Sequence, residues 1–313
     1  MFISIVHMRR KRLWSERKKA ILQTRAEVLG LVRSWFNDHE FCEVQGPVIV
    51  PAIAKWSNLS VDYCGLNAFL TSGLEPYAGV FGANLGKSYS ISPAFRQETS
   101  GFQHLTEYWR IEATIPYGEL ESIMEVQERL LSYVCQELQR NIQEEQLQNS
   151  VNRLRRVRSP FPRLSYEKAV ELLAEWFEVQ WGATLDQEHE TKLSLQHDVP
   201  FFVYELPVGV ETYYFRSTVD NPLLSCSVDL IAPEGHGELS TGGQPVIGEE
   251  MLEKMKKEQL SCAEEQWFRD IEKMGSAPHA GFALGLERLL KWICNLDKVE
   301  EATAFPRLRE PYP

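Results

Sequence analysis

Two extended segments joined by a polar loop restrict the fold of this chain more than any other feature. Residues 88–96 and 108–115 have the composition of strands, and residues 97–106 between them are mostly polar. This order predicts an antiparallel pair with an unusually long connection. Because long loops inside compact domains are more often functional than short ones, we expect this loop to belong to a functional site.

Helical periodicity surrounds this strand pair. Apolar residues recur at i, i+3, i+4 and i+7 spacings on both sides of it, which is typical of amphipathic helices. The helices predicted in this way cover residues 15–39, 121–140, 166–177, 249–274 and 285–293. Further strands are expected at 42–50 (interrupted at Gly46 and Pro47), 200–206, 211–215 and 225–232, with a loop at 51–68 and a glycine-flanked turn at 237–243. The mixture predicts an α/β fold, an antiparallel β-sheet flanked by helices, without regular βαβ alternation.

The composition excludes several classes of protein. The 33 Lys and Arg residues stand against 44 Asp and Glu, so the formal net charge of the 313-residue chain is −11. Such a balance argues against a broad nucleic-acid surface, because phosphate contacts need basic residues. No apolar run reaches the roughly 18–20 residues that span a bilayer, and the first residues lack the apolar core of a signal peptide. We expect a cytoplasmic protein that binds neither DNA nor a membrane.

The cysteines and one basic stretch have ordinary interpretations. The six cysteines include no C-x-x-C pair, so reduced thiols are expected rather than a zinc knuckle or a redox pair. Residues 141–160 have the composition of a linker or an insertion. The arginines from Arg153 to Arg163 could contact phosphate, but a solvated helix followed by a turn is the simpler interpretation.

Three motifs suit phosphate chemistry. They are FRQE with HLTEY (95–98 and 104–108), GELSTGG (237–243) and GFALGLERL (281–289). The guanidinium groups of Arg96 and Arg288 match phosphate oxygens, and the carboxylate of Glu238 near several phosphates indicates a divalent cation. Taken singly, Arg96 could be a strand-end charge, Arg288 a surface arginine and Glu238 a turn residue.

In this order, the three motifs resemble the signature of class II aminoacyl-tRNA synthetases. The helix 15–39 with Gly46 and Pro47 resembles motif 1, the strand–loop–strand 92–112 motif 2, and GFALGLERLL motif 3. The strings SPFPRLSYEKAVELL, WGATLDQEHETKL, PHAGFALGLERL and FPR are similar to asparaginyl-tRNA synthetase, and DLIAPEGHGE also resembles the archaeal-type asparagine synthetase. The resemblance runs from about residue 15 to 309. It implies one catalytic domain over residues 1–313, whose first 14 residues form an N-terminal extension.

The resemblance also implies a nucleotide site. ATP would lie bent on the sheet, with Arg96 at the α-phosphate, Arg288 at the γ-phosphate and Tyr108 stacked on the adenine. The carboxylates of Asp229 and Glu238 would hold Mg²⁺. The ATP-binding residues implied are Arg96, Glu98, His104, Tyr108, Glu238, Gly285 and Arg288. The amino-acid carboxylate would attack the α-phosphorus and release pyrophosphate, with Arg96 and Arg288 as the catalytic residues.

The implied amino-acid site departs from the family pattern. The substrate-binding residues implied are Ser72, Glu75, Glu112, Glu211, Tyr213, Gly242, Gly243 and Pro245. Pro245 stands where the family has an arginine that grips the substrate side chain, and proline offers neither charge nor donor. Glu211 stands where a basic residue is common, and Glu75 falls where the family has a glutamine facing the amino group. We therefore expect a substrate other than plain aspartate or asparagine.

Three functions remain open at this point. The first is an ATP-dependent ligase that activates a small amino acid and passes it to ammonia, an amine or another non-tRNA acceptor. It is favoured because motif 1 begins near residue 15, which leaves no room before it for an anticodon-reading OB-fold. The second is tRNA aminoacylation by a minimal core. The third is a non-catalytic paralogue that binds a nucleotide or an amino acid. The family also implies a homodimer through helix 15–39, although Trp35 and Phe36 on its apolar face could equally belong to the intrachain core.

Overall fold

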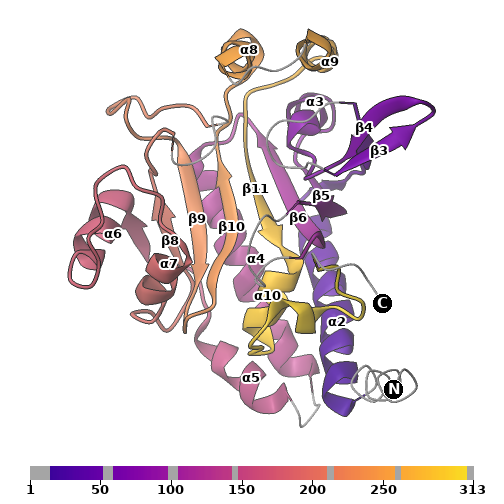
Figure 1. The fold of residues 1–313 in the computed structure, drawn as a ribbon. Coiled ribbons are helices and arrows are strands. Elements are labelled where there is room, and N and C mark those ends of the chain that lie inside the picture. The colour runs from indigo at the N-terminus through magenta and orange to yellow at the C-terminus, as the bar shows by residue number, and fades with distance from the viewer. Residues whose placement is uncertain are drawn as a thin grey trace, which may run out of the picture.

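A large mixed sheet organises the molecule (Figure 1). The computed structural model describes residues 15–51, 59–97, 105–142, 147–209, 215–257 and 262–308. Within these residues, eight strands form one sheet in the order β1-β5-β6-β11-β10-β9-β8-β7, and three form a second sheet in the order β2-β4-β3. The strands are β1 (Cys42–Glu43), β2 (Ile49–Val50), β3 (Ser60–Tyr63), β4 (Leu66–Leu70), β5 (Ser88–Phe95), β6 (Glu107–Pro116), β7 (Arg163–Ser165), β8 (Phe201–Tyr204), β9 (Ser227–Ala232), β10 (Gly237–Gly243) and β11 (His279–Gly285).

Helices flank the large sheet. The α-helices are α2 (Glu16–Asp38), α3 (Glu75–Leu85), α4 (Leu120–Asn141), α5 (Gln148–Asn152), α6 (Tyr166–Leu173), α7 (Gln187–Ser194), α8 (Gly248–Lys257), α9 (Cys262–Lys273) and α10 (Leu286–Ile293), with short 3₁₀ turns at Arg153–Arg156 and Val299–Ala302. The predicted helix 15–39 is confirmed as α2. It begins because the hydroxyl of Ser15 accepts the N–H of Lys18 at 3.2 Å. None of the helices in the described residues is long and apolar enough to cross a bilayer.

The predicted antiparallel pairing is confirmed. Strands β5 and β6 pair antiparallel from Ser88 opposite Thr114 to Phe95 opposite Glu107. The central pairs β6–β11, β11–β10, β10–β9 and β9–β8 are antiparallel too, whereas the outer pairs β1–β5 and β7–β8 are parallel. The expected α/β fold with an antiparallel sheet flanked by helices is therefore present.

Several local predictions are wrong. Residues 237–243 are the central strand β10 and not a turn, and the expected loop 51–68 contains the β3–β4 hairpin, which turns at Cys64 and Gly65 with φ of 56° and 83°. Helices α3 and α7 lie in segments for which no element was predicted. The long helix expected at 249–274 is two helices, α8 and α9. Of the strand expected at 211–215, only Phe215 lies within the described residues.

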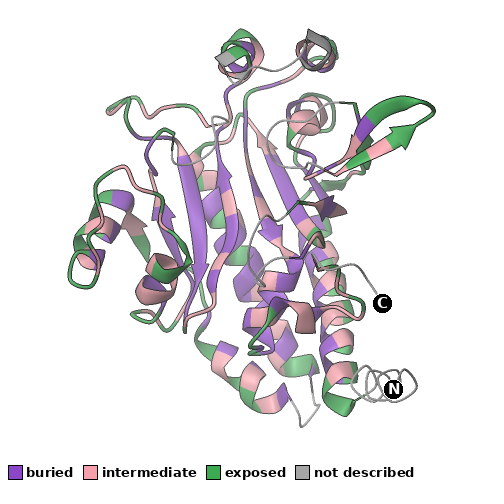
Figure 2. Ribbon diagram, in the orientation of Figure 1, coloured by how far each residue is buried: buried purple, intermediate pink, exposed green. Residues whose placement is uncertain are grey.

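The main core lies between the sheet and helices α2 and α4. One row across five strands consists of buried residues that are at most 8% exposed, namely Ile91, Ile111, Leu284, Ser240 and Leu230. Figure 2 shows buried residues concentrated along these strands and on the helix faces that meet them. Trp35 and Phe36 of α2 belong to this core, since they are only 4% and 0% exposed. Their burial favours the intrachain interpretation of that apolar face.

The basic stretch forms a short helix, α5, followed by a 3₁₀ turn, as the simpler interpretation predicted, but Arg153 is not solvated, since its side chain is only 18% exposed. Three of its arginines pair with carboxylates from distant parts of the chain. The pairs are Arg153 with Glu234, Arg156 with Asp198 (3.2 Å) and Arg163 with Glu121. Cysteines 42, 64, 135, 226 and 294 are free thiols, as expected.

Candidate active site

One face of the large sheet is lined by small and charged side chains. Neighbouring residues of a strand point to opposite faces, and residues opposite each other on paired strands share a face. The core face of the sheet is the one that helix α4 covers. Gln127 of α4 contacts the hydroxyl of Ser240, and Ile123 of α4 lies where a Cβ of Gly242 would point. The opposite face, called the open face below, carries one continuous row across five strands. This row is Ser90, Glu112, Ala283, Thr241 and Asp229.

The neighbouring rows of the open face follow the same rule. Two residues before Glu112 on β6, Arg110 lies opposite Ser92 and Gly285. Two residues after Glu112, Thr114 lies opposite Ser88 and Gly281. Gly243 lies opposite Gly281. The middle of this face is therefore almost without side chains, and the charged groups lie on either side of it. Such a floor leaves room for a ligand to lie against the backbone.

The first charged group surrounds Arg288. Nη1 of Arg288 lies 2.9 Å from Oε1 of Glu238 and donates to the carbonyl oxygen of the same residue at 3.3 Å. The hydroxyl of Thr241 donates to Glu238 at 3.2 Å, and the main-chain N–H of Glu238 donates to the carboxylate of Glu190 at 3.0 Å. The charges of Glu238 and then Glu190 raise the pKa of Arg288 against the effect of burial. Arg288 and Glu238 were expected here from the sequence, whereas Glu190, which α7 supplies, was not.

Glu287 fixes the helix that carries Arg288. Its carboxylate is 3% exposed, lies 2.7 Å from Nη1 of Arg25 on α2, and accepts the N–H of Trp109 at 2.9 Å. Helix α10 starts directly after Gly285. The Glu287 contacts join α10 to α2 and β6, and so hold Arg288 at a defined place beside the open face.

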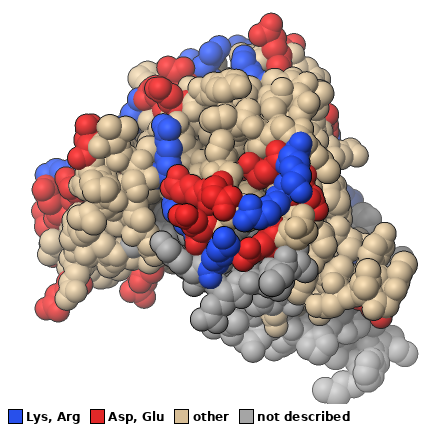
Figure 3. Space-filling model, turned by 90° about the horizontal axis from the view of Figure 1, so that it is seen from above, with Lys and Arg blue, Asp and Glu red and all other residues tan. Residues whose placement is uncertain are grey.

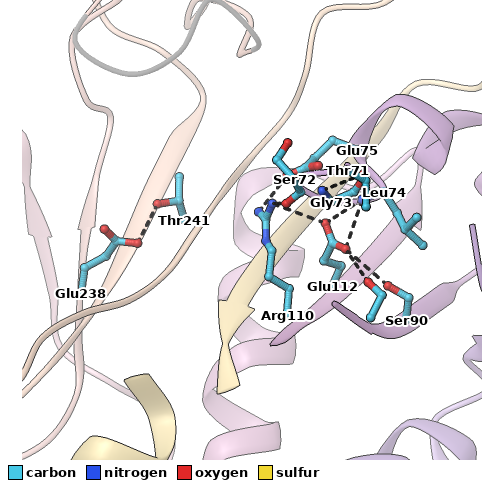
Figure 4. Close-up of polar contacts among 11 residues, drawn as sticks. Thr71, Ser72, Gly73, Leu74, Glu75, Ser90, Arg110, Glu112, Glu238 and Thr241 are labelled. Atoms are coloured by element: carbon cyan, nitrogen blue, oxygen red, sulfur yellow. Dashed lines mark hydrogen bonds and ion pairs between the residues drawn. The ribbon is translucent and has the colours of Figure 1, made fainter. Parts of the chain in front are cut away.

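The second charged group surrounds Arg110 (Figure 4). Its Nη2 lies 2.7 Å from Glu75 at the start of α3, and its Nη1 donates to the carbonyl oxygen of Ser72 at 2.5 Å and lies 3.9 Å from Glu112. Glu112 accepts the N–H of Leu74 at 3.1 and 3.2 Å. Burial raises the pKa of Glu112 to about 7, although Arg110 opposes the shift. Ser72, Glu75 and Glu112 were expected together; Arg110 was not.

Tyr108 lies within reach of charges from both groups. Burial raises the pKa of its phenol, and the charges acting on it come from Arg110, Glu75, Arg96 and Arg288. Arg96 directly follows β5, where its main-chain N–H donates to the carbonyl oxygen of Thr106 at 3.0 Å. The structure therefore gathers three of the expected ATP residues at one end of β5 and β6. Glu98 and His104, expected beside them, lie outside the described residues.

The far end of the open face is apolar. A Cβ on Gly243 would lie 2.5 Å from the ring of Phe215, so this ring covers Gly243, and Phe215 also forms an isolated β-bridge with Pro245. Gly242 differs from its neighbour, since a Cβ there would strike Cβ of Phe282 at 2.7 Å on the core face. Its small size has a packing reason, and its expected contact with substrate stays a prediction. Glu211 and Tyr213 lie outside the described residues.

The expected metal ligands are two carboxylates. Asp229 is 8% exposed on the open face opposite Thr241, whose hydroxyl contacts Glu238. In the part of the chain that the structure describes, no three acidic, histidine or cysteine side chains are grouped as metal ligands. Magnesium commonly takes one or two protein carboxylates and completes its shell with substrate phosphates and water. The donor chemistry of Asp229 and Glu238 fits that habit.

Charged side chains gather on the face of the molecule seen in Figure 3. Viewed from above, acidic side chains gather near the middle of the molecule with lysines and arginines at their edges (Figure 3). Figure 4 places Glu238 and Thr241 on β10, apart from the group of Arg110, Glu75 and Glu112 near α3. One face thus offers two separate centres of mixed charge.

Comparisons with known proteins agree with this arrangement. The family model of class II tRNA synthetases (D, K and N) matches residues 5–309. The asparagine–tRNA ligase of Desulforamulus reducens is 36% identical over 96% of this chain and 72% of its own length, and that of Thermococcus gammatolerans is 33% identical over 97% and 72%. The crystal structure of asparaginyl-tRNA synthetase from Pyrococcus horikoshii complexed with asparaginyl-adenylate has a TM-score of 0.92, with 30% identity over 98% of this chain and 72% of that one. These matches establish that the chain belongs to the class II tRNA synthetases of the D, K and N group, a family of ATP-dependent ligases.

Proposed function

We propose that this protein activates the carboxylate of a small amino acid with ATP, forming an aminoacyl-adenylate and pyrophosphate. The observation that carries the proposal is the pair of charged groups on one sheet face, with Tyr108 within reach of charges from both. A carboxylate oxygen of the amino acid attacks the α-phosphorus, the bond from that phosphorus to the β-bridging oxygen breaks, and pyrophosphate leaves. Positioning and charge stabilisation suffice for this step, so no protein nucleophile is required.

Each group then has a role in the proposal. Arg96 neutralises the α-phosphate, Arg288 holds the γ-phosphate and Tyr108 stacks on the adenine, with Gly285 leaving the backbone open beside them. Glu98 and His104, which lie outside the described residues, are proposed to contact the nucleotide as well. When bound, Mg²⁺ supplies positive charge to the phosphates. Asp229 and Glu238 would hold it, which requires Glu238 to exchange part of its contact with Arg288 for the cation.

The amino acid lies between Arg96 and the group of Arg110 in this proposal. Ser72, Glu75 and Glu112 surround its ammonium group, and Gly242, Gly243, Pro245, Glu211 and Tyr213 surround its side chain. The ring of Phe215 over Gly243, together with the β-bridge from Phe215 to Pro245, supports a substrate other than plain aspartate or asparagine. Asparagine is the second candidate, because the relatives are named for it and one is complexed with its adenylate.

The acceptor of the activated amino acid has two candidates. A non-tRNA acceptor such as ammonia or an amine is supported by the net charge of −11 and by the ion pairs that occupy Arg153, Arg156 and Arg163. A tRNA acceptor is supported by the names of the relatives. We also propose that residues 1–313 form one catalytic domain and that two copies associate, which light scattering tests directly.

One experiment tests the activation step. ATP–pyrophosphate exchange is measured with each of the twenty L-amino acids and with Mg²⁺ present or chelated. Magnesium-dependent exchange with one amino acid or a few similar ones supports the proposal, and its absence for all of them refutes it. The radiolabelled amino acid that gives exchange is then offered to bulk tRNA, ammonia and hydroxylamine, and the labelled product identifies the acceptor.

A further inference from the structure

We propose that Arg110 is a positioning residue that fixes Glu75 and Glu112 as a two-carboxylate subsite for the primary ammonium group of the amino acid. This inference rests on the proposed activation of an amino acid and adds to it a residue that the sequence motifs did not indicate. Arg110 lies on β6 between Tyr108 and Glu112, and the alternation of a strand puts all three on the open face.

The guanidinium of Arg110 is held from three directions. Nη2 pairs with Oε1 of Glu75 at 2.7 Å, and Nη1 donates to the carbonyl oxygen of Ser72 at 2.5 Å while lying 3.9 Å from Glu112. A guanidinium is planar and carries its donors in a fixed fork, so these contacts define its orientation. The Arg110 side chain is only 18% exposed. It therefore acts as a rigid bridge from β6 to the start of α3.

The two carboxylates would repel each other without this bridge. The point that a Cβ of Gly73 would occupy lies 2.4 Å from Oε2 of Glu75 and 2.6 Å from Oε1 of Glu112, so these oxygens are close neighbours. Like charges at such range favour protonation or separation of one partner. The positive charge of Arg110 lies between them and offsets the repulsion. Both carboxylates can then remain together on the open face.

The carboxylates differ in what they can still bind. Glu112 already accepts the N–H of Leu74 and contacts the hydroxyls of Ser90 and Ser92 at 3.5 and 3.4 Å. Glu75 has a side chain that is 44% exposed and directs it toward the same face. An incoming ammonium group carries three donors and would meet Glu75 first, with Glu112 behind it.

The net charge of Arg110, Glu75 and Glu112 favours a cationic ligand over an anionic one. One guanidinium faces two carboxylates, so the group is neutral to negative according to the protonation of Glu112. The guanidinium is already engaged by Glu75 and by the carbonyl oxygen of Ser72. A substrate carboxylate at Arg110 would have to displace Glu75. That anionic alternative predicts tighter amino-acid binding in Glu75→Gln, the opposite of what an ammonium subsite predicts.

The test compares Arg110→Met, Glu75→Gln and the double variant in ATP–pyrophosphate exchange with each of the twenty L-amino acids. Arg269→Met is the matched control, because Arg269 pairs with Glu249 at 3.0 Å between α8 and α9, away from this group. Because the side chains of Arg110 and Glu75 are 18% and 44% exposed, truncating one partner of this half-buried charge pair is expected to raise KM for the amino acid about tenfold. KM for ATP should change less than about twofold, since Arg110 does not hold the nucleotide. The control should match the wild type.

The double variant separates positioning from direct contact and from folding. If Arg110 acts through Glu75, the double variant should raise KM no further than Glu75→Gln alone, because coupled residues are not additive. Additive losses, an unchanged amino-acid KM in Arg110→Met, or an equal rise in both KM values would overturn the inference. Arg110→Lys keeps the charge without the fork and should give an intermediate KM, which covers the case in which Arg110→Met does not fold.

The outcomes also separate this inference from the function on which it rests. Exchange in the wild type that is insensitive to Arg110→Met refutes the role of Arg110 and leaves the activation of an amino acid intact. A wild type that neither exchanges pyrophosphate nor binds any of the twenty amino acids in calorimetry refutes both. Tighter binding in Glu75→Gln refutes the ammonium subsite in favour of an anionic one.

Discussion

Gly73→Ala and Gly30→Ala are the same substitution with opposite expected results. Gly30 lies on the exposed side of α2, and a Cβ there would meet nothing within 4 Å. Alanine favours a helix interior over glycine, so this variant should be more stable by about 0.5–1 kcal/mol. At Gly73, a Cβ would lie 2.4 Å from Glu75, 2.5 Å from Arg110 and 2.6 Å from Glu112. All three contacts are about 1 Å closer than ordinary van der Waals packing allows.

The magnitude at Gly73 follows from what must move. The three nearest atoms end flexible side chains, so the backbone can stay in place while the charged group spreads. Overpacking of this kind costs about 1–3 kcal/mol, reduced by the smaller entropy of unfolded alanine, so the two variants should differ by about 2 kcal/mol in free energy of unfolding. Displacement of Glu75 and Glu112 by about 1 Å should also raise KM for the amino acid about ten- to a hundredfold.

Urea denaturation and pyrophosphate exchange measure the two effects on the same preparations. Gly30→Ala should leave both KM values unchanged and so controls for the substitution itself. A Gly73→Ala protein that is as stable as Gly30→Ala, with an unaltered amino-acid KM, would refute both the close contacts and their role in the site.

Three further predictions use other parts of the structure. Arg25→Met should lower the free energy of unfolding by about 3–5 kcal/mol, because it leaves the buried carboxylate of Glu287 without its counter-charge; a loss below about 1 kcal/mol in urea would contradict this. Arg288→Ala should lower the rate of pyrophosphate exchange about 10²–10³-fold with little change in thermal unfolding, and undiminished exchange would refute the assignment. The pKa of Glu112 is about 7 in the folded protein against an ordinary 4.5, so the folded state binds this proton more tightly than the unfolded state. The free energy of unfolding of the wild type relative to Glu112→Gln should therefore fall by roughly 2–3 kcal/mol between pH 5 and pH 8. Equal pH dependence of the two denaturation curves would exclude the shift.

Helical spacing of apolar residues predicted α2 and α4, and strand-like composition predicted β5 and β6. The structure confirms all four elements. Strand β10 was predicted as a turn because glycines and small polar residues usually mark one. Its Gly242 and Gly243 are small because Phe282 and Phe215 press on opposite faces of the strand, a cause that lies in distant segments.

The residues of the candidate site also fall into those that the sequence predicted and those that it did not. Arg96, Glu238 and Arg288 stand in motifs that the sequence displays, and the structure gathers Arg288 with Glu238. Glu190 and Arg110 act through contacts made by α7 and α3, for which no helix was predicted. A capping signal at Asp186, whose side chain accepts the N–H groups of Glu188 and His189, could have indicated α7. The alternation along β6 could have placed Arg110 beside Glu112.

Strand β6 places its site residues on one face and its core residues on the other. Its even-numbered residues from Tyr108 to Thr114 carry the site, and the odd-numbered Ile111 and Ala113 fill the core. A deletion or insertion of a single residue in this strand would exchange the two sets, turning Arg110 and Glu112 toward the core and Ile111 toward the open face. Substitutions along β6 can therefore alter substrate preference one side chain at a time, whereas its length in residues cannot change by one without losing fold and site together.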